Sequence, residues 1–144
     1  MAKDLRSFLS DYEASHPELV LRLKKEIRSN QEITALVMKL EKEERYPVVI
    51  AENVVTCAGN KSPFPLITNL LASRTRCAQA FGSTFRTVHL DFHKRSRQSP
   101  IPPQVVSRTE APVKQVVKVG KDVDLTQTPA LYHHYMDPGP YFTA

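Results

Sequence analysis

The chain has 144 residues, of which 41% are hydrophobic and 24% charged, with 20 Lys and Arg against 15 Asp and Glu. This length is typical of one domain with a core of its own, and the composition excludes a disordered tail and a disulfide-stapled miniprotein. No run approaches the ~18 apolar residues of a membrane-spanning helix, and the start Met1–Asp4 has no signal-peptide character. With only Cys57 and Cys77, we expect a cytoplasmic protein.

The spacing of the apolar residues, together with capping residues, prolines and glycines, predicts the helices and strands of the N-terminal half. In chain order we expect a helix over 4–14, a strand within 19–27, a helix from 33 to about 44, a buried strand over 48–51, a loop over 55–63, a short strand over 66–68, and helices over 74–81 and 83–93. Ser29, with Glu32 three residues later, has the spacing of a capping box, and Ser73 is a second predicted N-cap. The prediction is a mixed α/β (α+β) layer, which makes residues 1–98 the N-terminal domain.

Proline changes the character of the chain after Gln98, because seven of the eleven prolines follow it. Residues 99–103 cannot be helical and are predicted to form an extended connector. Residues 105–106 and 115–119 are strand-like, and residues 129–144 are predicted to be extended backbone that feeds a sheet. We therefore assign 99–144 to a second unit, and its apolar end predicts that this unit is incomplete.

Charge is concentrated in the middle of the chain. Residues 74–118 hold nine basic side chains against Asp91 and Glu110. Lys94, Arg95 and Arg97 form the densest cluster. Two interpretations stay open, a solvated helix end whose cations favour the negative pole of the helix dipole, and a site for an anion such as nucleic acid, an acidic partner surface or a phosphorylated ligand. The cluster has no interleaved aromatic residues, which disfavours binding of single-stranded nucleic acid.

Few residues have the spacing of a catalytic or metal site. His89 and His93 lie four apart on a predicted helix, but the glutamate of the metalloprotease signature is missing, which favours a packing role. Cys57 and Cys77 form no C-x-x-C pair, and a buried thiol is the simpler interpretation of each. The four glycines form no phosphate-binding loop, so no catalytic or metal-ligating residue is assigned.

The richest polar and aromatic segment is 132–141. It contains two imidazoles, a carboxylate and three phenols, together with two prolines that restrict the backbone. His133, His134, Asp137 and Tyr141 are the candidate lining of a cleft for an aromatic or conjugated ligand. The alternative, a loop whose aromatic side chains cover a sheet edge, stays open.

Seven short motifs, in this order, resemble one family. They are Asp4–Leu9, Glu32–Leu36, Glu52–Val54, Thr68–Arg74, Glu110–Lys114, Gly120–Leu125, and His133-His134 leading through Asp137–Tyr141 to Thr143-Ala144. Each is weak alone, but their shared order over nearly the whole chain resembles the N-terminal part of the UbiD family of prenylated-FMN-dependent decarboxylases.

The resemblance implies an N-terminal α/β domain, then a split β-barrel that holds the flavin, then a C-terminal α/β domain that assists homo-oligomer formation. It also implies that the complete protein is a carboxy-lyase, which decarboxylates an aromatic or α,β-unsaturated acid reversibly and without oxidation. The cofactors of that complete protein would be prenylated FMN and, at the flavin phosphate, Mn²⁺ and K⁺. The family's catalytic and metal-binding residues lie downstream of this chain, so we expect no activity and no cofactor for the chain alone.

Two alternatives to this truncated-enzyme hypothesis stay open. The chain could be a small non-catalytic subunit that completes a partner's active site through residues 132–143. It could also be an anion-binding module that uses the basic segment 74–118, with nucleic acid and membrane disfavoured as partners.

Overall fold

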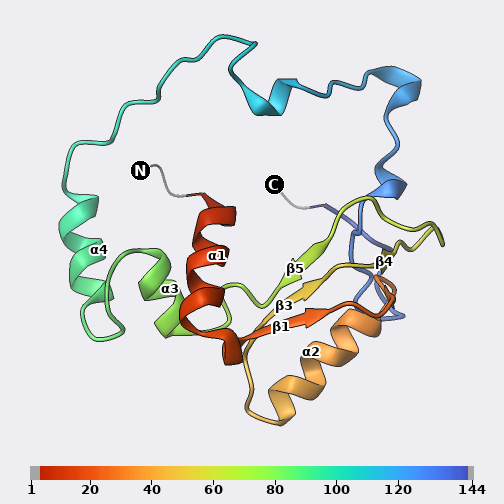
Figure 1. Cartoon of the computed structure of the whole chain (residues 1–144), viewed down its shortest axis with the longest axis horizontal. Coiled ribbons are helices and arrows are strands. Elements are labelled where there is room, and N and C mark those ends of the chain that lie inside the picture. The colour runs from red at the N-terminus through yellow and green to blue at the C-terminus, as the bar shows by residue number, and fades with distance from the viewer. Residues whose placement is uncertain (1–3, 143–144) are drawn as a thin grey trace.

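The first two thirds of the chain form a small sheet with helices on both faces (Figure 1). The computed structural model describes residues 4–142. Its helices and strands, in chain order, are α1 (Leu5–Ser15), β1 (Val20–Leu23), β2 (Ile27–Arg28), α2 (Glu32–Lys42), β3 (Val48–Ala51), β4 (Val54–Val55), β5 (Leu66–Thr68), α3 (Arg74–Ala80) and α4 (Val88–Ser96). The mixed α/β prediction is confirmed.

Strand β3 lies at the centre of the three-stranded sheet, between β1 and β5. It runs parallel to β1, with Val20 opposite Val48, and antiparallel to β5, with Val49 opposite Thr68. A second pair, β2 and β4, is parallel. All four residues of β3 are buried, as its continuous apolar run predicts.

The two faces of the sheet are covered by different helices. On one face, Tyr12 of α1 packs against Val48 and Ile50. On the other, Ile33 of α2 packs against Ala51. Because successive side chains of a strand point to opposite faces, a strand covered on both sides needs apolar residues at every position. This explains why β3 shows no polar alternation.

The predicted strand over 19–27 is divided in the structure. β1 ends at Leu23 and β2 starts at Ile27, and the two strands belong to different sheets. The side chain of Asn53 donates a hydrogen bond to the Lys24 carbonyl oxygen at 2.8 Å, which holds the intervening turn. The alternating pattern identified a strand but not the turn that ends it.

The predicted capping role of Ser29 is wrong. α2 starts at Glu32 after Gln31, whose φ of 65° is left-handed, and no side chain caps it. The Ser29 amide instead donates to the Val55 carbonyl oxygen at 2.8 Å, and its side chain is buried. The Glu32 carboxylate accepts from the Arg28 amide at 2.8 Å. Strand pairing thus uses the backbone that a capping box would need.

The two helices after β5 differ in how well they follow the prediction. Ser73 caps α3 as expected, since its hydroxyl accepts from the Arg76 amide at 3.4 Å. The next helix, predicted from Ser83, starts only at Val88. The Thr84 and Thr87 hydroxyls, 2.8 Å apart, hold the intervening turn. Short hydroxyl side chains of this kind compete with helix formation.

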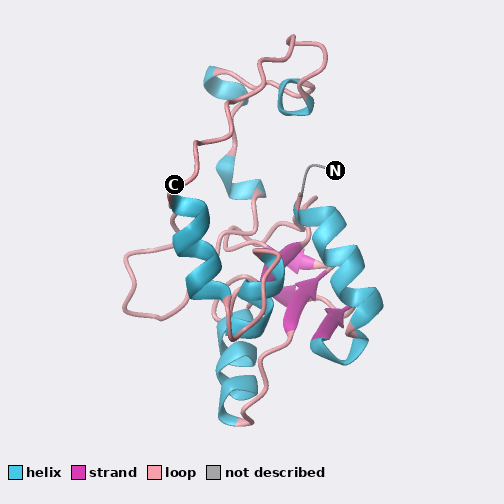
Figure 2. Ribbon diagram, turned by 90° about the vertical axis from the view of Figure 1, so that its left-hand side faces the viewer, coloured by secondary structure: helices cyan, strands magenta, loops and turns pink. Residues whose placement is uncertain are grey.

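After α4 the described chain first runs away from the sheet and then returns to it, where Tyr132 pairs with Asn30 (Figure 2). This part contains isolated 3-10 turns, at Pro112–Lys114, Gly120–Asp122 and Leu125–Gln127. The strands predicted at 105–106 and 115–119 are wrong for this structure, because neither segment finds a pairing strand within residues 4–142. The expected extended stretch pairs at one point, a parallel bridge between Tyr132 and Asn30, and its last two residues lie outside the described range. The split β-barrel stays a prediction.

Membrane insertion of a helix finds no support in the described residues. None of the helices there is both long and apolar enough to span a bilayer.

Candidate functional site

The segment with the candidate residues is joined to the N-terminal layer through Tyr132. Its amide donates to the Ser29 carbonyl oxygen at 3.1 Å, and its carbonyl oxygen accepts from the Gln31 amide at 2.8 Å. The left-handed Gln31 therefore lies where the backbone turns between this pairing and α2. The pairing places residues 133–137 beside the first turn of α2.

A tight turn follows Tyr132. The Tyr132 hydroxyl lies 3.0 Å from the carbonyl oxygens of both Tyr135 and Asp137. The Asp137 carboxylate accepts from the His134 amide at 2.9 Å, and the Asp137 amide donates to the His134 carbonyl oxygen at 3.0 Å. In this structure the carboxylate therefore stabilises the turn.

The two imidazoles lie side by side on the surface. The ring of His133 meets the Thr34 hydroxyl with 2.9 Å between Nδ1 and Oγ1. The centroids of the His133 and His134 rings are 6.4 Å apart, and both residues are exposed. Tyr141 is also exposed. The cleft-lining role of His133, His134, Asp137 and Tyr141 stays a prediction.

A cavity of about 490 Å³ lies beside this segment and is mostly apolar. Its lining residues come from two distant parts of the chain and are Cys57, Ala58, Leu125, Thr126, Thr128, Ala130, Pro140 and Phe142. The Cys57 sulfur lies 3.3 Å from the Ser29 hydroxyl and donates to the Ala130 carbonyl oxygen at 3.5 Å. This cavity could not be predicted from the sequence, because no local pattern relates residues 57–58 to residues 125–142.

The other sequence candidates do not assemble into a site. Within residues 4–142, no group of three or more His, Cys, Asp or Glu side chains could hold a metal ion. His89 and His93 are both exposed on α4, so the packing role predicted for His89 is not supported. Both cysteines are free, and Cys77 donates to the Leu71 carbonyl oxygen at 3.3 Å.

Comparison with known families gives one consistent result. Residues 15–93 match the family model of the 3-octaprenyl-4-hydroxybenzoate carboxy-lyase N-terminal domain, and residues 104–144 match that of the Rift-related domain of the same carboxy-lyase. The first match alone spans more than half of the chain. The chain belongs to the UbiD family.

Solved UbiD-class structures share its fold. The chain is 28% identical to an evolved dimeric form of HmfF from Pelotomaculum thermopropionicum in complex with prFMN, with a TM-score of 0.78 over 99% of this chain and 31% of that one. It is 26% identical to vanillic acid decarboxylase of Sedimentibacter hydroxybenzoicus in an open form, with a TM-score of 0.80 over 98% of this chain and 30% of that one. No curated protein sequence matches significantly. The chain thus spans about three tenths of these solved chains.

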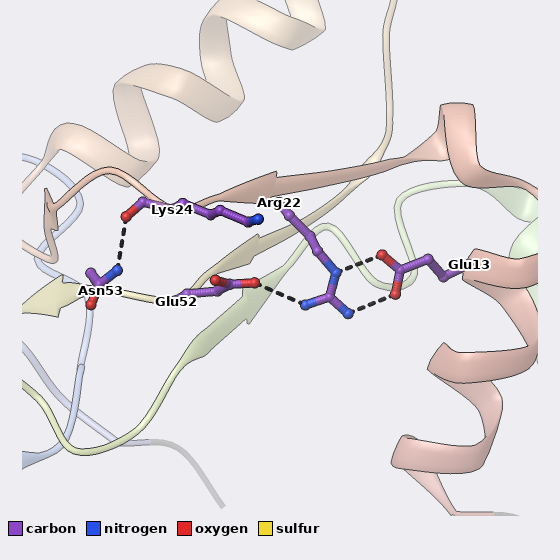
Figure 3. A network of polar contacts seen from close by, with 5 residues as sticks. All are labelled: Glu13, Arg22, Lys24, Glu52 and Asn53. Atoms are coloured by element: carbon purple, nitrogen blue, oxygen red, sulfur yellow. Dashed lines mark hydrogen bonds and ion pairs between the residues drawn. The ribbon is translucent and has the colours of Figure 1, made fainter.

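One UbiD motif, Glu52-Asn53, stabilises the N-terminal layer. Arg22 of β1 bonds the Glu13 carboxylate of α1 at 2.5 and 2.6 Å, and the Glu52 carboxylate at 3.1 Å (Figure 3). The hydrogen bond from Arg22 lowers the pKa of Glu13, and its two carboxylate partners raise the pKa of Arg22. The network connects α1 to the sheet edge.

A second UbiD motif, Thr68–Arg74, folds around a buried cation. Arg76 is 1% exposed and donates to the carbonyl oxygens of Asn69 at 2.7 Å, Leu70 at 3.3 Å and Tyr46 at 2.6 Å. Its guanidinium carbon lies 5.1 Å from the centroid of the Tyr12 ring. Burial of a charge is costly unless it is hydrogen-bonded, and the carbonyl oxygens accept from the two terminal nitrogens, while the buried Nε has no partner among residues 4–142. This role for Arg76 was not predicted from the sequence.

Proposed function

We propose that this chain is the N-terminal portion of a UbiD-class decarboxylase. The main support for this proposal is that the two family models match one after the other along this chain. The complete protein would decarboxylate an aromatic or α,β-unsaturated carboxylic acid reversibly and without oxidation. The names of its structural relatives support this class, since one is a vanillic acid decarboxylase and another is described in complex with prFMN.

The cavity next to the candidate segment does not by itself fit the flavin. The cavity beside residues 125–142 has a hydroxyl-bearing and apolar lining with no lysine or arginine to meet a phosphate group. We therefore assign prenylated FMN, with the Mn²⁺ and K⁺ that the family implies, to parts of the UbiD length that this chain does not span.

Three finer assignments belong to the same proposal. We keep residues 1–98 as the N-terminal domain and 99–144 as the opening of the flavin-binding split barrel. This division is supported by two separate family matches that end at residue 93 and start at residue 104. We keep His133, His134, Asp137 and Tyr141 as residues that face the cleft of the complete enzyme. A cytoplasmic location is supported by the free thiols of Cys57 and Cys77.

Exposed apolar side chains support an assembly with further protein. Ile101 and Val105 are each 94% exposed, and Val113 is 80% exposed. Apolar surface of this extent normally marks an interface. We propose that the remaining domains of the decarboxylase cover it. A partner subunit that supplies those domains as a separate chain is the second candidate, and we also propose that the complete protein forms a homo-oligomer.

The test is the activity of a longer protein in which this chain is followed by the other domains of a UbiD-class enzyme. Loaded with prenylated FMN, it is expected to release CO₂ from one member of a panel of aromatic and α,β-unsaturated acids that includes vanillic acid. It should also exchange labelled bicarbonate into that acid. The same protein loaded with unmodified FMN is the control. A folded, prenylated-FMN-bound protein that turns over no member of the panel would contradict the proposal.

A further inference from the structure

The outward face of α4 carries a row of basic side chains around one leucine. Leu90, His93, Lys94 and Arg97 recur at the i, i+3, i+4 and i+7 positions that share one face of a helix, and all four are exposed. His89 lies next to this row. We call these five residues the α4 basic face.

Two residues on the other side of the helix contact the turn before it, although no residue of α4 is fully buried. Asp91 accepts a hydrogen bond from the Ser83 hydroxyl. Arg95 donates to the Phe81 carbonyl oxygen at 2.5 Å, and its guanidinium carbon lies 4.3 Å from the centroid of the Phe81 ring. Of the three clustered cations in the sequence, Arg95 is thus structural, and Lys94 and Arg97 remain on the surface.

The charged side chains of the α4 basic face are therefore all cationic. Asp91 is the only carboxylate of α4, and it points to the packed side. Solvated helices usually intersperse both signs and gain from Glu and Lys pairs four residues apart. Within residues 4–142, neither Lys94 nor Arg97 has an ion-pair partner. A complementary surface must therefore be anionic, with an apolar spot opposite Leu90.

We propose that the α4 basic face is a docking surface for an acidic protein surface, with Leu90 as its apolar contact. Charge complementarity favours a protein over the other anions. Duplex DNA is typically bound through about 6–10 phosphate contacts, and anionic membranes through clusters of about 4–8 Lys and Arg. Two lysine or arginine side chains are too few for either, but they are enough for a compact interface.

The experiment measures binding of the full chain to three probes, an acidic amphipathic peptide of Leu and Glu, phosphatidylserine-containing vesicles, and a short DNA duplex. The variant Lys94→Glu/Arg97→Glu reverses the two cations. The control Lys114→Glu/Lys118→Glu makes the same change of net charge at exposed positions of the same basic segment. We expect the α4 variant to weaken peptide binding roughly tenfold and the control to leave it within about twofold.

A third variant separates charge from apolar contact. Leu90→Ser should weaken binding of the Leu and Glu peptide several-fold while leaving binding of polyglutamate unchanged. Far-UV circular dichroism tests whether each variant keeps its helices. If Lys94→Glu/Arg97→Glu loses them, Lys94→Gln/Arg97→Gln is used in its place. Equal losses in the α4 and control variants would overturn the proposal, as would tighter binding to vesicles or to the duplex than to the peptide. Activity of the complete enzyme does not enter this test.

Discussion

The guanidinium of Arg76 donates a hydrogen bond to the carbonyl oxygen of Tyr46, 2.6 Å away and thirty residues earlier in the chain. Because the same side chain also reaches the carbonyl oxygens of Asn69 and Leu70, it connects the start of β3 to the loop that follows β5. Within residues 4–142 the charge is stabilised by main-chain carbonyl dipoles, since no carboxylate pairs with it there. Arg76 is therefore the central polar contact of this part of the fold.

Removal of this guanidinium should destabilise the chain strongly. Arg76→Met leaves three carbonyl oxygens without their donor, and we expect a loss of about 3 kcal/mol in the free energy of unfolding. Arg74→Met is the matched control at an exposed position of the same helix, with an expected loss under about 1 kcal/mol. Urea denaturation measures both. Equal losses would show that the carbonyl contacts contribute little.

The ion pair of Glu13 and Arg22 should make stability depend on acid pH. Arg22 lowers the pKa of Glu13 below its ordinary value of 4.5, so the pair stabilises the fold above pH 4.5. This contribution is lost as the pH falls further and the folded-state carboxylate takes up a proton. Between pH 5 and pH 3, the urea midpoint should fall less for Glu13→Gln than for the wild type.

The control for this pH dependence is Glu41→Gln, since Glu41 is exposed and makes no ion pair within residues 4–142. Its midpoint should follow the wild-type pH curve. A Glu13→Gln curve parallel to the wild type would mean that the pair has no net effect in solution.

Packing of α2 on the sheet should depend on Ile33. This side chain is 1% exposed and contacts Ala51, Val54 and Leu66. Ile33→Ala is expected to cost about 2–5 kcal/mol, from lost apolar burial and the cavity that remains. Met38→Ala, on the same helix but 46% exposed, should cost under about 1 kcal/mol. Thermal or urea unfolding measures both losses in the free energy of unfolding. A loss for Ile33→Ala as small as that for Met38→Ala would argue against the position of α2.

The turn after Tyr132 should loosen when the tyrosine hydroxyl is removed. Tyr132→Phe deletes the contacts to the carbonyl oxygens of Tyr135 and Asp137 but keeps the ring. We expect faster amide hydrogen exchange at His134 and Asp137, whose amides are bonded within this turn. Tyr135→Phe is the control, because Tyr135 is 79% exposed. Unchanged exchange in Tyr132→Phe would show that the Asp137 carboxylate holds the turn alone.

The sequence by itself determined the elements whose burial is set by local spacing. The stripe of α1, the continuous run of β3 and the Ser73 cap each depend on residues within one or two turns or one strand, and all three are present. The order of the short motifs along the chain also indicated the UbiD family. Local periodicity is sufficient here because it reports which face of an element is buried.

The tertiary structure alone decided the contacts between distant segments. Ser29 lost its predicted cap because strand pairing with Val55 and Tyr132 engages its backbone, a competition that no local pattern reveals. The cavity beside Cys57 and the three acceptors of Arg76 likewise bring together residues far apart in the chain. Segment 115–119 has strand propensity but forms no strand here. A segment with strand propensity forms a strand only when the edge of another strand pairs with it.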